Sequence, residues 1–241
     1  MIQESFEKEI IVSQFECDYL NRMTAGSVLK ETQQISTDHC SVLGLTQEVY
    51  DKTNTVFLLS KISLEFYRSI LVGEKLKITT YPSLPVRAVY HRYTSLCDEE
   101  GKQAAVVSSR WVLVDTKARK ILRKPPETLP LPFLSEKVTE LDCSIQKTKE
   151  VQSGGIEKAS YSRTDMNGHL NNAVYADLIC DHLPDDCLTD QFIKKMVICY
   201  HREVKRNEYV EIQIGKLEDH CGYYVVGEKD NKISFEANVL F

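Results

Sequence analysis

The sequence predicts an α+β protein built from two similar halves, each with a long helix wrapped by a curved antiparallel sheet. The expected order of elements, one strand, one helix and then several strands, occurs twice in the 241 residues. A shift of 147 residues places Asp18 on Asp165, and a shift of 133 places Tyr67 on Tyr200. We therefore expect two equivalent sheets that pair side by side as a pseudo-dimer.

The elements of the first half follow from its periodicity. Thr24 can cap a helix whose apolar positions, such as Val28 and Val42, recur at helical spacing until Gly44. Alternating or β-branched runs indicate strands, and a short helical turn is expected at 47–52. The expected strands are 6–15, 55–67, 74–81, 87–97 and 102–115.

Prolines at positions 125, 126, 130 and 132 separate the halves, at a density that neither a helix nor a central strand tolerates. We therefore expect an N-terminal domain at 1–124, a Pro-rich and polar linker at 125–150 and a C-terminal domain at 151–241.

The second half repeats the pattern. Asn171 or Asn172 can cap its helix, which is expected to run through Leu183 and to stop at Pro184. The expected strands are 156–163, 192–204, 209–217, 223–228 and 233–240, and a turn at Asp230–Asn231 joins the last two.

Composition excludes several function classes. The net charge is −5, and Lys and Arg are scattered in ones and twos, so no nucleic-acid surface is expected. No stretch approaches the roughly 18 apolar residues of a membrane span, and the N-terminus is charged, so we expect a cytoplasmic protein with no membrane association.

The eight cysteines form no CxxC pair and lie mostly in apolar-periodic stretches. We expect reduced, buried thiols and neither a metal nor a cofactor. A zinc site could be assembled from three Cys/His pairs, but their spacing matches no known finger or ribbon. These pairs are Cys180/His182, Cys199/His201 and His220/Cys221.

Polar, reactive side chains crowd at the start of the second helix. Asp165, Asn167 and His169 stand at alternate positions, and Gly168 loosens the backbone between two of them. The positive end of the helix dipole lies beside them, where an anionic intermediate would be stabilised. In the first half, Leu20 and Arg22 replace the asparagine and the histidine. Only one half therefore retains the reactive set.

Three segments resemble motifs of the acyl-acyl-carrier-protein (acyl-ACP) thioesterases, a family with plant members that terminate fatty-acid synthesis and with bacterial members. Residues 165–175, DMNGHLNNAVY, resemble its D-x-N-x-H-x-N-N-x-x-Y signature. Residues 111–116, WVLVDT, are similar to its tryptophan-strand motif, and residues 200–203, YHRE, to its second catalytic segment. The similarity covers nearly the whole chain and implies a tandem double hot-dog fold.

The resemblance implies hydrolysis of fatty acyl-ACP to free fatty acid and carrier protein, and no cofactor is expected. No N-terminal extension resembles a plastid transit peptide, which favours a bacterial cytoplasmic origin. The N-terminal hot dog would shape the acyl-chain pocket, with a degenerate site, and the C-terminal one would carry the chemistry. The partner would be the acyl carrier protein with its phosphopantetheine-linked acyl chain, and the sequence also allows a homodimer. The implied catalytic residues are Asp165, Asn167, His169 and Glu203.

One departure from the family is visible. Several members have a cysteine directly after the glutamate, whereas this chain has Val204, and its nearest thiol is Cys199. This disfavours a Cys-His mechanism. In the first half, Ile70 is expected at the place of Glu203.

The chemistry requires a base for water and a donor for the developing oxyanion. Either Glu203 or Asp165 can be the base, and the sequence leaves both open. The amide of Asn167 and backbone N–H groups at the helix start would polarise the thioester carbonyl, while His169 would orient the water or carry its proton. Strict strand alternation would put Glu203 on the face of Cys199, unless a bulge intervenes.

Two lysine-containing pairs, at 194–195 and 205–206, are candidates for docking an acidic carrier protein. Other activities of the hot-dog class remain alternatives, namely acyl-CoA hydrolysis and dehydration of 3-hydroxyacyl thioesters. A third alternative is a protein that binds acyl thioesters without turnover.

Overall fold

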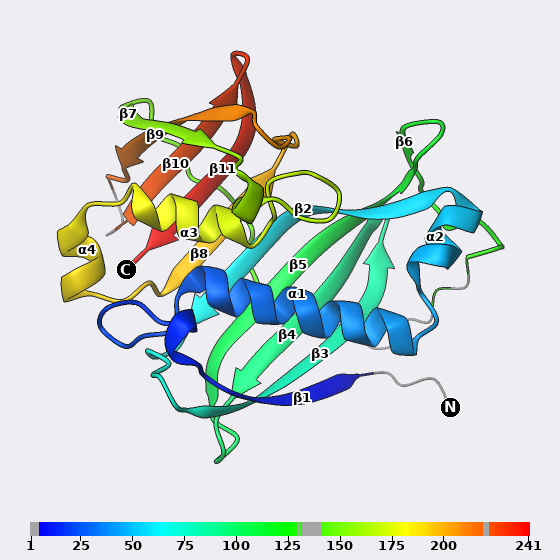
Figure 1. The fold of residues 1–241 in the computed structure, drawn as a ribbon, viewed down its shortest axis with the longest axis horizontal. Helices are drawn as coiled ribbons and strands as arrows, with labels where there is room; N and C mark the ends of the chain where they lie inside the picture. Colours follow the sequence, from blue (N-terminus) through cyan, green and yellow to red (C-terminus); the bar gives the residue numbers. More distant parts are fainter. Residues whose placement is uncertain (1–4, 130, 132–140, 219–221) are drawn as a thin grey trace.

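The computed structural model describes residues 5–129, 131, 141–218 and 222–241. The described strands form one antiparallel sheet, with β6 attached to β5 at its side (Figure 1). The strands are β1 (Phe6–Ile11), β2 (Thr55–Phe66), β3 (Lys75–Val86), β4 (Val89–Cys97), β5 (Gln103–Asp115), β6 (Lys120–Ile121), β7 (Gln152–Lys158), β8 (Lys195–Tyr200), β9 (Tyr209–Lys216), β10 (Gly222–Lys229) and β11 (Lys232–Leu240).

The strand order is the same when read outward from the centre into each half. It runs β1-β3-β4-β5-β2 and then β8-β11-β10-β9-β7, so the two halves meet at β2 and β8. These two strands pair antiparallel, with Ile62 opposite Ile198 and Glu65 opposite Lys195. The predicted tandem fold, with its two sheets joined as a pseudo-dimer, is confirmed.

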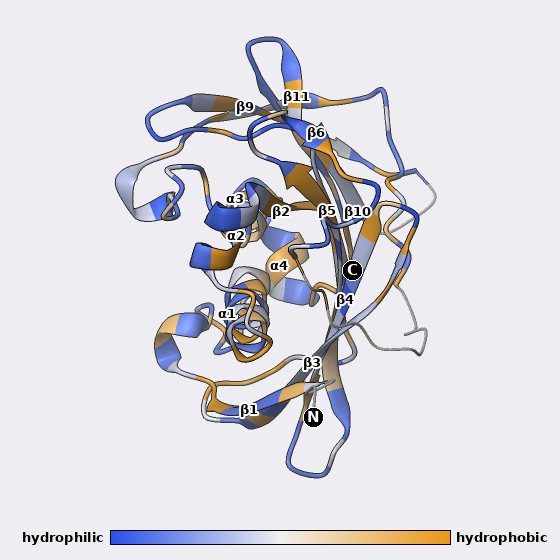
Figure 2. Cartoon of the chain, turned by 90° about the vertical axis from the view of Figure 1, so that its right-hand side faces the viewer, coloured by the Kyte–Doolittle hydropathy of each residue, from blue (hydrophilic) through white to orange (hydrophobic). Residues whose placement is uncertain are grey.

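The helices lie together on one side of the sheet, as the edge-on view shows (Figure 2). As predicted, Thr24 caps the first, its side chain accepting the N–H of Ser27 at 3.1 Å. Val28 and Ile35 of that helix and Ile179 of the third are fully buried between helices and sheet. The helices are α1 (Ala25–Val42), α2 (Gln47–Thr53), α3 (Val174–Asp181) and α4 (Asp185–Asp190).

The second half departs from the prediction in its helix. α3 has 8 residues against 18 in α1. Asn171 does not cap it directly, because its side chain accepts the N–H of Ala173 and its carbonyl accepts the N–H of Val174, each at 2.9 Å. These bonds make a turn, and α3 begins only after it. α4 was not predicted.

Part of the predicted linker, residues 141–150, packs against the sheet. The Asn238 side chain accepts the Gln146 N–H at 2.6 Å and donates to the Gln146 carbonyl at 2.8 Å. A methyl group on Gly215 would lie 2.4 Å from the carbonyl oxygen of Glu150, so the segment touches the sheet closely. The predicted domain limits stay a prediction.

Acid is expected to loosen this segment through Glu236, a buried carboxylate that contacts Lys147, Tyr224 and His201. Burial alone would raise the pKa of Glu236, but hydrogen bonds from those groups lower it below its ordinary 4.5. A lowered folded-state pKa stabilises the fold above the ordinary value, and this stability is lost as pH falls through the folded value. We expect Glu236→Gln to flatten the acid side of the unfolding free energy, measured by urea titration between pH 3 and 6. The exposed Glu211→Gln is the control, and parallel pH profiles for the two variants would contradict the prediction.

None of the described helices combines the length and apolar composition that a membrane crossing requires.

Candidate active site

A tight loop carries the predicted polar set. The carboxylate Oδ1 of Asp165 accepts the N–H groups of Asn167 at 2.9 Å and of His169 at 3.2 Å. Gly168 has φ +75°, a conformation that glycine adopts without strain, and its N–H is bonded to the carbonyl of Asp165. The loop therefore fixes the backbone of the asparagine and the histidine.

The first half contains the same loop with other side chains. Asp18 Oδ1 accepts the N–H of Leu20 at 2.9 Å and the N–H of Arg22 at 2.8 Å. Asn21, with φ +62°, takes the place of the glycine. The aspartate thus braces the loop in both halves, although the side chains at the asparagine and histidine positions differ.

Glu203 lies beside His169, with 3.3 Å between Glu203 Oε2 and His169 Nε2. The two segments run together, because the N–H of Leu170 donates to the Val204 carbonyl and the N–H of Arg206 donates to the Gly168 carbonyl, each at 2.8 Å. The side chain of His169 is 26% exposed and that of Glu203 is 53% exposed, so both are accessible to water.

The turn of Glu203 toward His169 begins at the end of β8. The N–H groups of His201 and Arg202 both donate to the Ser234 carbonyl, at 2.8 and 3.0 Å, which breaks strand alternation. His201 then contacts Glu236 at 2.9 Å, away from the loop. The alternation expected for a continuous strand therefore does not reach Glu203, because regular pairing stops at Tyr200.

The structure corrects the predicted match of Ile70 with Glu203. The N–H of Met23 donates to the Ile70 carbonyl at 2.8 Å, as the N–H of Leu170 donates to the Val204 carbonyl. Ile70 therefore corresponds to Val204, and Ser69 corresponds to Glu203. The predicted match was wrong by one residue. The offset of 133 residues that relates Tyr67 to Tyr200 increases by one before Ile70 and not after it.

The start of α3 offers fewer free N–H donors to an oxyanion than expected. Its first two amides, on Ala173 and Val174, are already hydrogen-bonded to Asn171. The side chain of Asn167 is exposed at the surface of the loop. Two of the backbone donors expected at the helix start are therefore occupied, whereas the side-chain amide of Asn167 is accessible.

Two tyrosines lie beneath the loop. The ring of Tyr175 packs edge-on against Tyr200 at 5.3 Å and Phe235 at 5.0 Å, and the Tyr200 hydroxyl donates to the Asn172 carbonyl at 2.8 Å. Burial raises the pKa of Tyr175, and the nearby carboxylates of Glu203 and Asp165 raise it further. The signature contained Tyr175, but sequence reasoning assigned it no role. It supports the loop as a neutral phenol.

A cavity of about 450 Å³ opens next to this loop, between α1, α2 and the sheet of the first half. Met166 stands at its mouth, and its wall includes Phe57, Tyr90 and Trp111. A smaller hollow of about 30 Å³ lies between α1 and the start of α3 and shares Trp111 and Gln33 with the cavity. Because they share wall residues, the two hollows adjoin each other along α1.

The thiol nearest in sequence to Glu203 is not part of this arrangement. Cys199 is buried, and burial raises the pKa of its thiol. Its electrostatic neighbours are Lys61, Glu236 and Arg110 and do not include the loop residues. The described residues contain no cluster of His, Cys, Asp or Glu that could hold a metal ion. His220 and Cys221, considered above for zinc, lie outside the described residues.

Family models match both halves of the chain. The model of the acyl-ACP thioesterase N-terminal domain matches residues 3–131, and that of the C-terminal domain matches residues 145–240. The chain belongs to the acyl-ACP thioesterase family.

Relatives of this acyl-ACP thioesterase family member include a chloroplastic acyl-[acyl-carrier-protein] hydrolase, FATB3, of Cuphea viscosissima, which is 22% identical over 86% of this chain and 54% of its own length. The oleoyl-acyl carrier protein thioesterase 2 of Arabidopsis thaliana is 20% identical over 86% of this chain and 62% of its own length. The chain thus spans little more than half the length of the curated relatives it matches.

Solved structures of the family share the double hot-dog fold. An acyl-ACP thioesterase from Bacteroides thetaiotaomicron has a TM-score of 0.80 at 19% identity and covers 99% of this chain and 98% of its own. The 12:0-ACP thioesterase from Umbellularia californica has a TM-score of 0.80 at 16% identity and covers 100% of this chain and 94% of its own.

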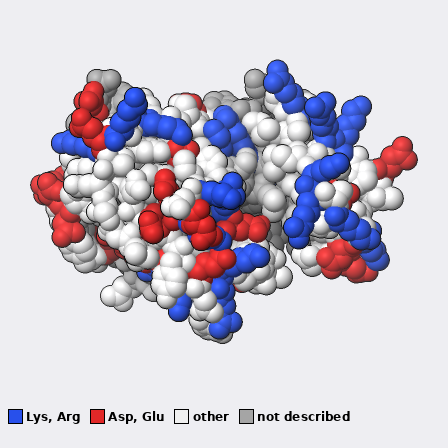
Figure 3. Space-filling view, turned by 90° about the horizontal axis from the view of Figure 1, so that it is seen from above, with Lys and Arg blue, Asp and Glu red and all other residues white. Residues whose placement is uncertain are grey.

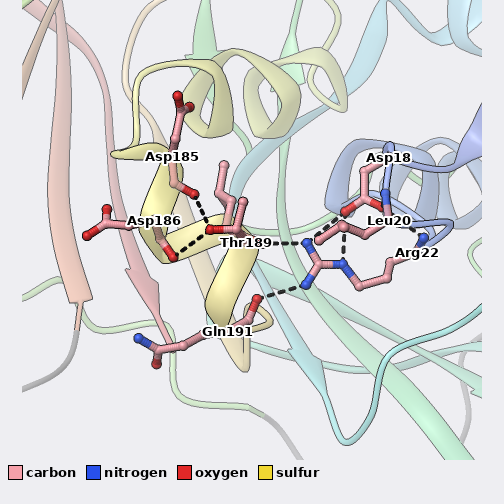
Figure 4. A network of polar contacts seen from close by, with 8 residues as sticks. Asp18, Leu20, Arg22, Asp185, Asp186, Thr189 and Gln191 are labelled. Carbon is pink, nitrogen blue, oxygen red and sulfur yellow. Dashed lines mark hydrogen bonds and ion pairs between the residues drawn. The ribbon is translucent and has the colours of Figure 1, made fainter.

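In the first half of the chain, the position equivalent to His169 is occupied by an arginine. Arg22 takes the place of His169, and its guanidinium donates to Asp18 Oδ2, to the Gln191 carbonyl at 2.8 Å and to the Leu188 carbonyl (Figure 4). These bonds tie the first-half loop to the end of α4, inside a pocket of about 530 Å³. Arg22 therefore joins the two halves at the position where the second half has His169.

Proposed function

We propose that this protein hydrolyses the thioester of fatty acyl-ACP and releases free fatty acid and carrier protein. The observation that carries the proposal is the water-accessible pair of His169 and Glu203, at the loop whose Met166 also lines the first-half cavity. Family membership and the fold agree with it. The N-terminal half would hold the acyl chain, and the C-terminal half would hold the reacting thioester.

In the proposed mechanism, Glu203 is the base that accepts a proton from the attacking water, and His169 orients that water. The side-chain amide of Asn167 donates to the carbonyl oxygen as it becomes an oxyanion. The water oxygen bonds to the carbonyl carbon and the C–S bond breaks. The pantetheine thiolate, whose thiol has a pKa of about 8.5, leaves without an acid and is protonated afterwards.

Asp165 acts in this proposal as a positioning residue. Its Oδ1 is occupied by two loop amides, and Asp18 makes the same two bonds in the half without a catalytic histidine. The positioning role of Asp165 therefore requires an oxygen that accepts hydrogen bonds and does not require a base.

The carrier protein would dock beside the loop, on Lys205 and Arg206. The backbone of Lys205 pairs with His169, and the guanidinium of Arg206 lies 5.3 Å from the ring centre of Tyr161. The other predicted pair is less suited, because Lys195 opens β8 at its far end and is ion-paired with Glu65 at 3.0 Å.

A second basic surface lies away from the loop. Seen from above, Lys and Arg gather at the right-hand end of the molecule, where Figure 1 places β6 (Figure 3). Exposed residues of this β5–β6 hairpin include Lys117, Arg119 and Lys120. It provides a natural comparison for docking experiments.

We expect the double reversal Lys205→Glu/Arg206→Glu to raise KM for acyl-ACP by about tenfold and to reduce its salt dependence. The kcat/KM for the matching acyl-pantetheine should stay unchanged, because that substrate carries no acidic surface. Lys117→Glu/Lys120→Glu is the matched reversal on the hairpin. If only the hairpin variant raises KM, the docking site belongs there.

The function is tested by incubating the purified protein with acyl-ACP and acyl-CoA panels of matched chain length and measuring free fatty acid. Release from acyl-ACP with higher kcat/KM supports the proposal, and preferential release from acyl-CoA identifies the alternative hydrolase. Formation of an enoyl thioester from a 3-hydroxyacyl substrate would identify a dehydratase. Tight binding without any product would identify a binding protein. The bacterial cytoplasmic location and a homodimer stay predictions.

A further inference from the structure

A buried arginine forms part of the wall of the 450 Å³ cavity. Arg92 lies on β4 and is 9% exposed. Its Nη1 lies 3.1 Å from His39 Nδ1 and donates to Thr80 Oγ1 at 3.3 Å, while its Nη2 donates to Cys40 Sγ at 3.6 Å. These contacts hold the guanidinium in one orientation between α1 and the sheet.

No ion pair joins Arg92 to a carboxylate in the part of the chain that the structure describes. Arg22, Arg68 and Arg163 each contact an aspartate or glutamate side chain. A buried charge is costly unless it is paired, and a guanidinium stays protonated in proteins. Arg92 is therefore a charged group for which the described residues supply no counter-charge.

Among the described residues, none of the groups that contact Arg92 is a carboxylate. Burial lowers the pKa of its guanidinium, opposed by the Cys40 thiol and the Tyr50 phenol. Burial in turn raises the pKa of Tyr50, so this phenol is neutral at physiological pH. His39 and Thr80 complete the contacts, from α1 and β3. An anionic or oxygen-bearing ligand group would find fixed donors here.

We propose that the cavity binds acyl chains that carry an oxygen group, a carboxylate or a hydroxyl, toward their distal end, and that Arg92 binds this oxygen. The inference rests on the proposed function, because the chain would enter from the thioester site. A guanidinium donates two parallel hydrogen bonds to a carboxylate and single bonds to a hydroxyl. An unsubstituted chain would leave Arg92 desolvated and without a ligand acceptor.

The distance along α1 indicates which chain length reaches Arg92. Gln33 lines the hollow next to Ala173, and Cys40 contacts Arg92 seven residues later. At ~1.5 Å per helical residue the two positions are roughly 10 Å apart along the axis. Carbon–carbon bonds of about 1.5 Å advance an extended zigzag chain by less than their length, so roughly eight carbons cover this distance.

The test uses acyl-pantetheine amides, in which nitrogen replaces the thioester sulfur, so binding is measured without turnover. Three eight-carbon probes are compared by calorimetry: octanoyl, 8-hydroxyoctanoyl and 7-carboxyheptanoyl. We expect the carboxy probe, and to a smaller degree the hydroxy probe, to bind the wild type about tenfold or more tighter than octanoyl. Equal or tighter binding of octanoyl by the wild type overturns the proposal.

Two variants assign the preference to the arginine. Arg92→Met is expected to abolish it, whereas Arg87→Met, which removes an exposed arginine of the β3–β4 turn, should leave it intact. Cys40→Asp keeps the arginine and supplies a carboxylate beside it, so it too is expected to abolish the preference. If Arg92→Met fails to fold, Cys40→Asp still tests whether Arg92 causes the preference. A preference that survives in a folded Arg92→Met, or in Cys40→Asp, overturns the role of Arg92.

Hydrolysis of the same three acyl chains, supplied as pantetheine thioesters, is measured alongside binding of the amides. This comparison separates the cavity proposal from the proposed function. If the amides show the preference and no thioester is hydrolysed, the cavity assignment stands and the hydrolase proposal fails. If all thioesters are hydrolysed with octanoyl preferred in both binding and kcat/KM, the hydrolase proposal stands and the cavity assignment fails.

Discussion

Glu203→Gln is expected to lower kcat for acyl-thioester hydrolysis by about 10²- to 10⁴-fold while KM changes little. The amide cannot accept the proton of water, although it keeps the shape of the side chain. His169→Ala should cause a loss in the same range, because its imidazole lies 3.3 Å from the glutamate. Circular dichroism and the urea midpoint would establish that both variants are folded.

The variants of Asp165 separate the two carboxylates. Asp165→Asn keeps an acceptor oxygen for the N–H groups of Asn167 and His169, so it should retain most of the wild-type kcat. Asp165→Ala removes the acceptor, so the loop should lose its conformation and the enzyme its activity. If Asp165→Asn falls as far as Glu203→Gln, then Asp165 takes part in proton transfer and the assignment of a positioning role is wrong.

His201→Ala is the matched control for His169→Ala. His201 is also paired with a glutamate at 2.9 Å, but this glutamate is Glu236 of β11 and not Glu203. We expect its removal to leave kcat near the wild-type value. A loss equal to that of His169→Ala would place the reacting centre elsewhere.

Arg22→Ala is expected to lower the free energy of unfolding by about 3 kcal/mol, since hydrogen bonds from charged groups contribute ~1.5–3 kcal/mol each and are partly interdependent. The change leaves the Leu188 and Gln191 carbonyls and the Oδ2 atom of Asp18 without the guanidinium donor. Urea titration measures the effect.

Arg119→Ala, at an exposed position of the β5–β6 hairpin, is the control for this stability effect. Its cost should stay within about 0.5 kcal/mol, as for ordinary surface substitutions. Turnover of Arg22→Ala, measured where it is folded, should remain high, because its pocket contains neither His169 nor Glu203. A cost for Arg22→Ala as small as that of the control would mean that Arg22 does not join the halves.

The sequence alone predicted the elements whose signals are local. α1 begins after Thr24 as expected, because a cap and a helical apolar period occur within one continuous segment. The turn at Asp230–Asn231 has both residues at positive φ, as its composition indicated. The loop from Asp165 to His169 was visible for the same reason, since its polar residues are close neighbours in the chain.

Only the tertiary structure decided features that depend on pairing between distant segments. Glu203 reaches His169 because the chain leaves β8 where the Ser234 carbonyl accepts two successive N–H groups. No period in the sequence reveals this irregularity. The proposed distinction between Glu203 as base and Asp165 as positioning residue rests on the hydrogen bonds of both loops. The place of Arg92 in the cavity wall depends on how β4 faces α1 across the core. Local composition therefore determined the duplicated fold and the loop, and strand register with long-range packing decided which side chains meet.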